Sequence, residues 1–383
     1  MPSRAGTPSK RDGAATSTSH ASPPARLPGF ATTAGTRKYR GRFAGKLAAD
    51  FFRQFPGGLQ AASIGLGTYL GECTDEDDAS YTAAVRRAVA GGINFLDTAI
   101  NYRCQRSERA VGRALRALIE TRVAARDEII VCTKGGYVPL DGAPPESREA
   151  YQEYVEREFY APGVMAPDDV VGGGHCLAPS YLAHQVARSR ENLGVQTIDV
   201  YYLHNPEQQL DVLEPARFRE VMRDAFAALE ARVEAGEIRC YGCATWNGLR
   251  TPPNRRGHLS LAELVEVAVE VAGDAHHFRV VQLPLNLAMT EAVRVPTQRV
   301  AGREPVPLVQ AAAELGITVV ASASLMQAQL TRQLPPAIAE AFPNATTDAQ
   351  RALAFVRSLP GVTTALVGMK SDAHVDENLG AGR

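Results

Sequence analysis

The sequence has few of the residues and patterns that indicate a specialised class of protein, such as many cysteines, a large net charge or long apolar runs. It contains one tryptophan, six methionines and six cysteines among 383 residues, and its formal net charge is only −1. Without a charge excess, there is no reason to expect nucleic acid or an anionic membrane surface as a partner. No run of 18 uncharged apolar residues occurs, so a membrane-spanning helix is not expected. The chain is 45% hydrophobic, which is enough for one large domain or two small ones.

The cysteines are too scattered to indicate a metal site. Only Cys240 and Cys243 lie close together in the sequence, and no second pair lies near them. Zinc motifs combine two such pairs, or one pair with spaced histidines, so we predict no metal site. Scattered cysteines in a chain of this size fit a reducing compartment, which favours the cytoplasm.

The first 45 residues differ in composition from the rest of the chain. They are rich in Ser, Thr, Pro, Gly and Arg, and their one acidic residue is Asp12. Few large apolar side chains are present to offset the entropy of ordering, so residues 1–45 are predicted to form a flexible or disordered tail before a folded domain of residues 46–383. An organellar transit peptide, which has a similar composition, is the minor alternative. A secretory signal is not expected, because the segment has no apolar core.

One unit recurs from about residue 60 onwards. A helical segment ends at a glycine, and an apolar, β-branched strand follows at once. Strands that are apolar throughout indicate a parallel sheet covered by helices on its faces. The expected strand ends lie near Thr68, Thr98, Lys134, His204, Thr245, Gln282, Ser322 and Gly368. Eight such units predict an α/β fold, a closed (β/α)8 TIM barrel, whereas no glycine-rich GxGxxG loop near the start supports a Rossmann domain.

The interval between the third and fourth strands is unusually long. It leaves an insertion from Tyr137 to Pro179 that is rich in glycine, proline and acids. Loops that follow barrel strands lie on the catalytic face, so we predict that the insertion covers the active-site mouth and sets specificity. Its glycine and proline clusters indicate irregular backbone, while EAYQEYVEREFY is compatible with a helix that turns Tyr151, Tyr154 and Phe159 towards the pocket. A role in subunit contacts is the alternative, and the oligomeric state is not readable from the sequence.

Several of the predicted strands end in a polar residue of a reactive type. Asp97 ends the second strand, with Tyr102 five residues later, and Lys134 and His204 end the third and fourth. Because the carboxyl ends of barrel strands converge on one mouth, these side chains are expected to meet.

This pattern resembles the aldo-keto reductase family. The segments DTAINY, SERAVGRAL, VCTKGG and DVYYLHN match the family's catalytic set in order and context, with Asp97, Tyr102, Lys134 and His204 at the catalytic positions. The similarity extends from about Ile64 to Asn378. The resemblance implies a nicotinamide-dependent oxidoreductase that reduces an aldehyde or ketone to an alcohol, or catalyses the reverse reaction.

The chemistry that the resemblance implies needs these residue types. A hydride reaches the carbonyl carbon from the nicotinamide, and a proton must reach the oxygen. Tyr102 would donate that proton, although its ordinary pKa is about 10. The Lys134 ammonium would favour the phenolate, Asp97 would hold Lys134 charged and in position, and His204 would orient the substrate.

The resemblance also implies a cofactor-binding set. Its members are Gly67, Thr68, Tyr69, Asp97, Thr245, Gln282, Ser322, Leu325, Gly368, Lys370, Ser371, His374 and Asn378. The segment from Lys370 opens a predicted helix, whose first N–H groups favour an anion. In the family this segment holds the adenosine 2′-phosphate, so Lys370 favours NADP, with NAD the alternative.

The cofactor-binding segments depart from the family pattern at three positions. Ala244 stands where a serine is usual, and Ser322 stands where a tyrosine usually stacks on the nicotinamide. His374 occupies a position that is often arginine, which weakens the case for NADP. Trp246 is a candidate to replace the missing aromatic side chain.

Two other classes of function fit parts of the pattern. A barrel lyase or aldolase would use Lys134 as a Schiff-base nucleophile, but a neighbouring carboxylate keeps lysine protonated and therefore unreactive. A non-enzymatic nicotinamide-binding regulatory subunit would not need all four catalytic residue types. The leading prediction is therefore an NADP-dependent enzyme that acts on a small carbonyl or alcohol substrate.

Overall fold

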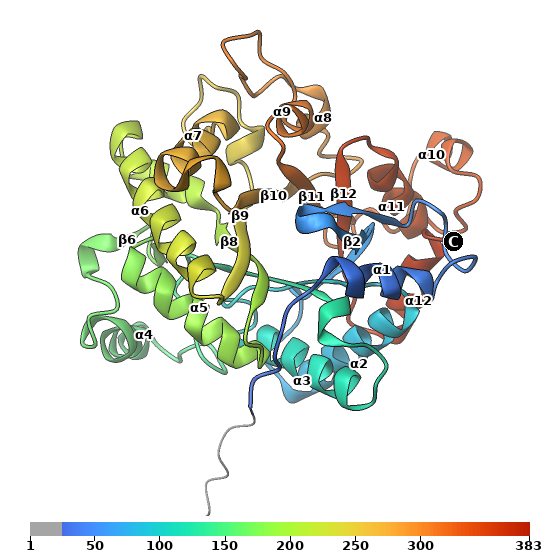
Figure 1. Cartoon of the computed structure of the whole chain (residues 1–383), viewed down its shortest axis with the longest axis horizontal. Coiled ribbons are helices and arrows are strands. Elements are labelled where there is room, and N and C mark those ends of the chain that lie inside the picture. Colours follow the sequence, from blue (N-terminus) through green and yellow to red (C-terminus); the bar gives the residue numbers. More distant parts are fainter. Residues whose placement is uncertain (1–24) are drawn as a thin grey trace, which may run out of the picture.

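A closed parallel barrel forms the centre of the computed structural model, which describes residues 25–383 (Figure 1). Its neighbouring strands follow the order β10-β11-β12-β3-β4-β5-β8-β9 and back to β10. The strands are β3 (Ile64–Gly67), β4 (Phe95–Asp97), β5 (Ile130–Gly135), β8 (Ile198–His204), β9 (Ile238–Ala244), β10 (Phe278–Pro284), β11 (Thr318–Ser322) and β12 (Val362–Gly368). The predicted (β/α)8 barrel is confirmed, and each strand ends within two residues of its predicted position.

Helices surround the barrel (Figure 1). Those that follow the barrel strands are α2 (Asp75–Gly91), α3 (Arg106–Glu120), α5 (Pro179–Leu193), α6 (Pro215–Glu234), α7 (Leu261–Ala272), α9 (Leu308–Glu314), α11 (Asp348–Ser358) and α12 (Asp372–Gly380), with the short helices α8 (Glu291–Arg294) and α10 (Pro336–Ala341) in connecting loops. The predicted glycine stops are clear at Gly92 and Gly194, which cap α2 and α5 in the left-handed conformation. The apolar side chains between strands and helices form the main core.

A hairpin lies against the barrel interior before the first barrel strand. Its strands β1 (Phe52–Phe55) and β2 (Leu59–Ala62) pair antiparallel. Phe55 meets Phe95 edge-on at 5.3 Å between ring centroids, and Leu59 belongs to the same buried cluster as the inward-facing barrel residues. The hairpin thus extends the core inside the barrel. Its two strands come before the first barrel strand in the chain.

The predicted tail is wrong for residues 25–45. This segment contains α1 (Thr33–Gly41), which begins where the Thr32 hydroxyl accepts a hydrogen bond from Gly35 N at 2.9 Å. Tyr39 is fully buried, and its hydroxyl donates to Val89 O. Before the helix, Leu27 N donates to Gly194 O at 2.7 Å. A few well-placed side chains therefore anchor a segment whose average composition is that of a tail, while residues 1–24 lie outside the described part of the chain.

The insertion between β5 and α5 is a small packed unit. It contains α4 (Arg148–Val155), which continues into a π-helical turn (Glu156–Tyr160), and the two-stranded pair β6 (Val170–Val171) and β7 (His175–Cys176). The helix expected for EAYQEYVEREFY is confirmed. The expectation of irregular backbone without packing is wrong, because Val155, Phe159 and Met165 form a core of their own with Cys176 and Tyr181.

Candidate active site

The centre of the site is a buried ion pair between two strand ends. Lys134 Nζ on β5 donates to Asp97 Oδ1 on β4, and it also donates to Thr98 O at 2.8 Å. The two side chains are 1% and 5% exposed. Burial acts to lower the pKa of Lys134, but the Asp97 carboxylate and the Tyr102 oxygen outweigh it and leave the pKa raised. The lysine is therefore a protonated ammonium at neutral pH.

Asp97 is held from its other side as well. Gln282 Nε2, from β10 across the barrel, donates to Asp97 Oδ2 at 2.8 Å. Burial raises the pKa of Asp97 above its ordinary value, and the Lys134 ammonium and the Gln282 hydrogen bond oppose the rise. Gln282 is thereby fixed in orientation by a carboxylate, so the barrel interior joins two of the predicted residues that lie 185 positions apart.

Tyr102 lies beside this pair on the turn after β4. Lys134 Nζ is 5.0 Å from the centroid of the Tyr102 ring. Burial raises the pKa of Tyr102, while the Lys134 ammonium acts to lower it. The Tyr102 ring is flanked edge-on by Tyr69, at 5.0 Å between centroids, and by His204, at 5.7 Å. The four predicted catalytic side chains are thus brought together.

His204 is neutral and held through its backbone. Burial, together with the Lys134 charge, lowers the pKa of His204 well below its ordinary value. His204 O accepts a hydrogen bond from His175 Nε2 at 2.7 Å. Gln209 Nε2 donates to His175 Nδ1 at 2.8 Å, which places the proton of His175 on Nε2. His175 itself is fully buried, and burial lowers its pKa to about 4.

The sequence did not point to His175 or to the loop-borne Tyr137. The Tyr137 ring lies between the two histidines, with centroids 5.0 Å from His175 and 5.0 Å from His204. Its hydroxyl accepts from Asn205 Nδ2 at 2.9 Å. Both residues lie in the insertion, where no periodic pattern marks them, so only the fold could reveal this edge-on arrangement.

A cavity of about 780 Å³ opens in front of these side chains. Its lining includes nearly all of the predicted site residues: Gly67, Thr68, Tyr69, Asp97, Tyr102, His204, Thr245, Gln282, Ser322, Leu325, Gly368, Lys370, His374 and Asn378. Lys134 is absent from the lining because it lies behind Asp97 and Tyr102. Ser371 is absent too, because it caps α12 by accepting from His374 N at 3.3 Å.

Several polar atoms of the lining are buried without a partner. They are Thr245 Oγ1, Ser324 Oγ, Asn101 Oδ1 and His204 Nδ1. Buried polar groups are normally hydrogen-bonded, so this set fits a ligand rich in donors and acceptors. The volume of about 780 Å³, with a lining that includes Trp246 after β9 and Asn378 on α12, also suits a dinucleotide with a small second molecule.

The insertion contributes less to the cavity than expected. Tyr137, its first residue, is the one member that lines the cavity within residues 25–383. Tyr151, Tyr154 and Phe159 do not line it, and the expectation that they face the pocket is wrong. They pack with the insertion's own core, and the Tyr154 hydroxyl donates to Pro139 O at 2.8 Å. The insertion thus contacts the site through Tyr137 and His175.

The amino-acid sequence itself decides the family. Residues 63–251 match the model of the Aldo/keto reductase family. The chain belongs to the aldo-keto reductase family. It is 29% identical over 187 residues to a D-threo-aldose 1-dehydrogenase from Pseudomonas sp, covering 48% of each protein. It is 25% identical over 193 residues to the aldo-keto reductase YhdN from Bacillus subtilis (strain 168), covering 50% of this chain and 45% of that protein.

The curated relatives are matched over about half of their length. Solved structures extend the likeness over most of the fold. An aldo/keto reductase from Klebsiella pneumoniae, solved in complex with NADP and acetate, superposes with a TM-score of 0.58 at 20% identity, over 86% of this chain and 89% of that one. At this identity the likeness concerns the fold alone, a closed barrel of eight parallel strands.

The chain departs from the family pattern around the predicted nicotinamide position, as the sequence indicated. Ser322 and Ala244 both line the cavity, and neither offers a ring. Trp246 also lines it and is 47% exposed. Its backbone N donates to Glu207 Oε1 at 2.8 Å, which fixes the loop that carries the indole. Trp246 therefore remains the candidate for stacking on the nicotinamide.

The predicted phosphate end of the cavity is occupied by an ion pair. Lys370 Nζ, just before α12, lies 2.9 Å from Asp77 Oδ1 on α2. The hydrogen bond from Lys370 is the main cause that lowers the pKa of Asp77. Asp77 also accepts from Glu72 N at 2.6 Å. Lys370 is thus positioned at the rim of the cavity by a carboxylate from α2.

Within residues 25–383, no helix is long and apolar enough to cross a membrane. No group of three or more potential metal ligands is found among the described residues.

Proposed function

We propose that this protein is an NADP(H)-dependent oxidoreductase that reduces an aldehyde or ketone to an alcohol, or catalyses the reverse reaction. The observation that carries the proposal is the buried Asp97–Lys134 pair beside Tyr102 and His204, at the wall of one cavity. Family membership supports it, and so does the NADP bound in the related Klebsiella pneumoniae structure.

The cofactor, when bound, supplies the hydride that adds to the carbonyl carbon. The chain's own groups would hold it along the cavity: Thr245 and Gln282 at the nicotinamide, and Lys370 with the first N–H groups of α12 at the 2′-phosphate. Gln282 Nε2 already donates to Asp97, which leaves its carbonyl oxygen to accept from the carboxamide.

The proton comes from Tyr102. Its hydroxyl is held as a neutral acid by burial, and the Lys134 ammonium beside it stabilises the phenolate that forms as the proton leaves. His204, neutral and fixed through its carbonyl by His175, would hydrogen-bond the substrate oxygen next to Tyr102. The Tyr69, Tyr137 and Trp246 side chains line the cavity in which the reacting carbon would lie.

The aldolase alternative has no support in the geometry. A Schiff-base lysine must lose its proton before it attacks, whereas Lys134 is buried against a carboxylate and its pKa is raised. Borohydride treatment in the presence of a keto substrate should therefore leave Lys134 unmodified.

The test is NADPH oxidation with a panel of aldehydes and ketones, on wild type and on Tyr102→Phe. We expect the variant to lose roughly 10²–10⁴-fold in kcat, because general acid catalysis is typically worth that much. Its affinity for NADPH, followed by Trp246 fluorescence, should stay within a few-fold of wild type.

Tyr69→Phe is the matched control, since it removes a hydroxyl from the neighbouring cavity ring and keeps the ring contact. Its kcat should change by only a few-fold. Near wild-type kcat in Tyr102→Phe at saturating substrate would remove Tyr102 from the mechanism.

A further inference from the structure

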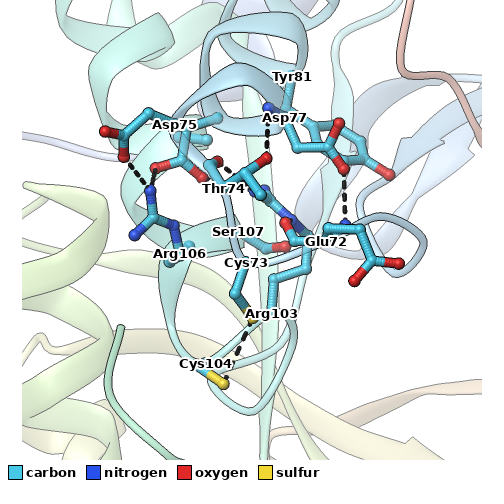
Figure 2. Close-up of polar contacts among 12 residues, drawn as sticks. Glu72, Cys73, Thr74, Asp75, Asp77, Tyr81, Arg103, Cys104, Arg106 and Ser107 are labelled. Carbon is cyan, nitrogen blue, oxygen red and sulfur yellow. Dashed lines mark hydrogen bonds and ion pairs between the residues drawn. The ribbon is translucent and has the colours of Figure 1, made fainter. Parts of the chain in front are cut away.

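Two cysteines face each other beside the active site. Cys73 lies in the loop between β3 and α2, and Cys104 lies in the turn that follows Tyr102 (Figure 2). Their Sγ atoms are 3.5 Å apart. Cys73 is partly exposed, whereas Cys104 is 7% exposed. Neither residue is used by the proposed reaction.

Arg103 clamps the two segments together (Figure 2). Its guanidinium donates to Glu72 O at 2.7 Å and to Thr74 O at 3.3 Å. These carbonyls flank Cys73 in the sequence, and Arg103 precedes Cys104. A third bond, to Asp78 Oδ1 at 2.6 Å, is buried. The residue next to one cysteine therefore binds the backbone on both sides of the other, which holds the sulfur atoms face to face.

The turn that carries Cys104 has an uncommon backbone. Arg103, Cys104 and Gln105 have φ angles of 49°, 53° and 66°, in the left-handed region that side chains other than glycine seldom adopt. Gly142 N donates to Cys104 O at 3.0 Å and supports the turn from the insertion. This backbone directs the Cys104 side chain at Cys73. A disulfide bond measures about 2.05 Å, so the sulfur atoms need to approach by only about 1.5 Å.

We propose that Cys73 and Cys104 form a reversible disulfide when the protein meets a hydroperoxide, and that this bond slows the reaction at Tyr102. The bond itself is independent of the proposed function, whereas its kinetic effect rests on that function.

The chemistry starts at the more exposed sulfur. The Cys73 thiolate attacks one oxygen of the hydroperoxide, the O–O bond breaks, and an alcohol or water leaves, so that Cys73 becomes a sulfenic acid. Cys104 Sγ then attacks Cys73 Sγ, the S–O bond breaks, and the oxygen leaves as water with the proton of Cys104. Two thiols and one hydroperoxide yield one disulfide, one alcohol or water, and one further water. Burial is the main cause that raises the pKa of Cys104 to about 12, so Cys104 stays protonated and is not the sulfur that attacks the hydroperoxide first.

The bond would act directly on the catalytic turn. Cys104 is two residues from Tyr102, and Cys73 is four residues from Tyr69, whose ring contacts Tyr102 at 5.0 Å between centroids. Ser107 Oγ, three residues after Cys104, donates to Thr68 O at 2.8 Å. Drawing the sulfur atoms together would therefore shift the turn of residues 102–107, which positions the Tyr102 hydroxyl. A misplacement of about 1 Å can cost roughly 100-fold in rate, so we expect kcat to fall by about 10–100-fold.

The test begins with the chemistry alone. The full chain is treated with hydrogen peroxide, alkylated, and digested with trypsin without reductant. The disulfide predicts a linked pair of peptides, residues 54–86 and 104–106, which each contain one of the two cysteines. Dithiothreitol should release them. Absence of this linked pair, with Cys73 found either free or over-oxidised, would overturn the proposal.

The kinetic measurement uses the same samples. Peroxide should lower the kcat of wild type, and dithiothreitol should restore it. Cys73→Ser and Cys104→Ala should each keep their kcat after peroxide. If one of these two variants fails to fold, the other still tests the proposal. Cys176→Ser, which alters a buried cysteine in the insertion, is the matched control and should lose activity like wild type.

The outcomes separate the two proposals. A linked peptide pair with unchanged kcat would overturn the kinetic effect. A linked pair in a protein that turns over no carbonyl substrate when reduced would support the disulfide and contradict the proposed function instead.

Discussion

The pKa values of single residues at this site are set by burial and by close charged or hydrogen-bonding partners. Lys134 and Asp97 are ordinary side chains whose pKa values are set by their contact inside the barrel. His204 is kept neutral by burial and by the Lys134 charge, and its carbonyl is tied to His175. Sequence comparison named three of these four residues. The fourth, His175, is visible only in the folded chain.

His175 provides a pH-dependent contribution to stability. Burial lowers its pKa from 6.5 to about 4 in the folded state, while the unfolded chain keeps the ordinary value. The unfolded state therefore binds more protons below pH 6.5, and stability is lost as pH falls from about 6.5 to 4. The loss approaches roughly 3 kcal/mol, since each pKa unit is worth about 1.4 kcal/mol.

Urea unfolding at several pH values, on wild type and on His175→Gln, measures this contribution. The variant should be less stable at pH 7 but should show a flatter pH dependence between 4 and 6.5. Identical slopes in the two proteins would assign the acid sensitivity to other groups.

Lys370 is expected to recognise the 2′-phosphate at the cavity rim. Lys370→Met should weaken NADPH binding by roughly 10–100-fold, because hydrogen bonds to charged groups contribute about 1.5–3 kcal/mol. NADH lacks the phosphate, so its affinity should hardly change. Fluorescence titration with both cofactors measures the difference.

Asp77→Asn is the matched control for Lys370, because it removes the carboxylate that pairs with Lys370 and leaves the lysine in place. NADPH should bind this variant at least as tightly as wild type. Equal losses for both cofactors in Lys370→Met would show that Lys370 holds the fold of the rim instead of the phosphate.

Two elements outside the regular βα units, α1 and the insertion, are ordered and packed although their composition does not indicate it. Helix α1 packs on the barrel through Tyr39, and the insertion packs on itself while presenting Tyr137 to the cavity. Both segments are polar or rich in glycine and proline on average. Their order depends on a few side chains that find partners far away in the sequence.

Removal of the Tyr39 side chain should test whether α1 stabilises the domain. Tyr39→Ala should lower the free energy of unfolding by roughly 3–5 kcal/mol, as is typical for a large aromatic residue truncated in a core. Arg37→Ala, at an exposed position of the same helix, should change it by less than about 0.5 kcal/mol. Thermal unfolding of both variants measures the effect. Equal, small shifts would mean that α1 is not coupled to the barrel.

The insertion should influence substrates through Tyr137. Tyr137→Ala removes the ring between His175 and His204, so we expect a KM increase of roughly tenfold and a changed ranking of carbonyl substrates. Tyr151→Ala alters a tyrosine of the insertion that does not line the cavity, and its kinetics should match wild type. If both variants shift KM alike, the insertion acts as a whole and not through one residue.

At the scale of the whole molecule, the barrel explains why distant positions form one site. Eight parallel strands place their carboxyl ends in a ring, so Asp97 and Gln282 can share a hydrogen bond across the interior. The last and first βα units are likewise joined by the Lys370–Asp77 pair at the rim of the cavity.

The sequence by itself determined the barrel, the strand ends and which polar residues meet at the barrel mouth. It could do so because apolar strand runs, glycine stops and polar strand ends are local patterns, and every barrel strand brings its own end to the same mouth. Only the tertiary structure decided that residues 25–45 are ordered, that the insertion has a core, that His175 supports His204, and that Cys73 faces Cys104. Each of these depends on contacts between segments far apart in the chain. Burial and pairing at such contacts are set by the assembled fold, and no local composition or spacing specifies them.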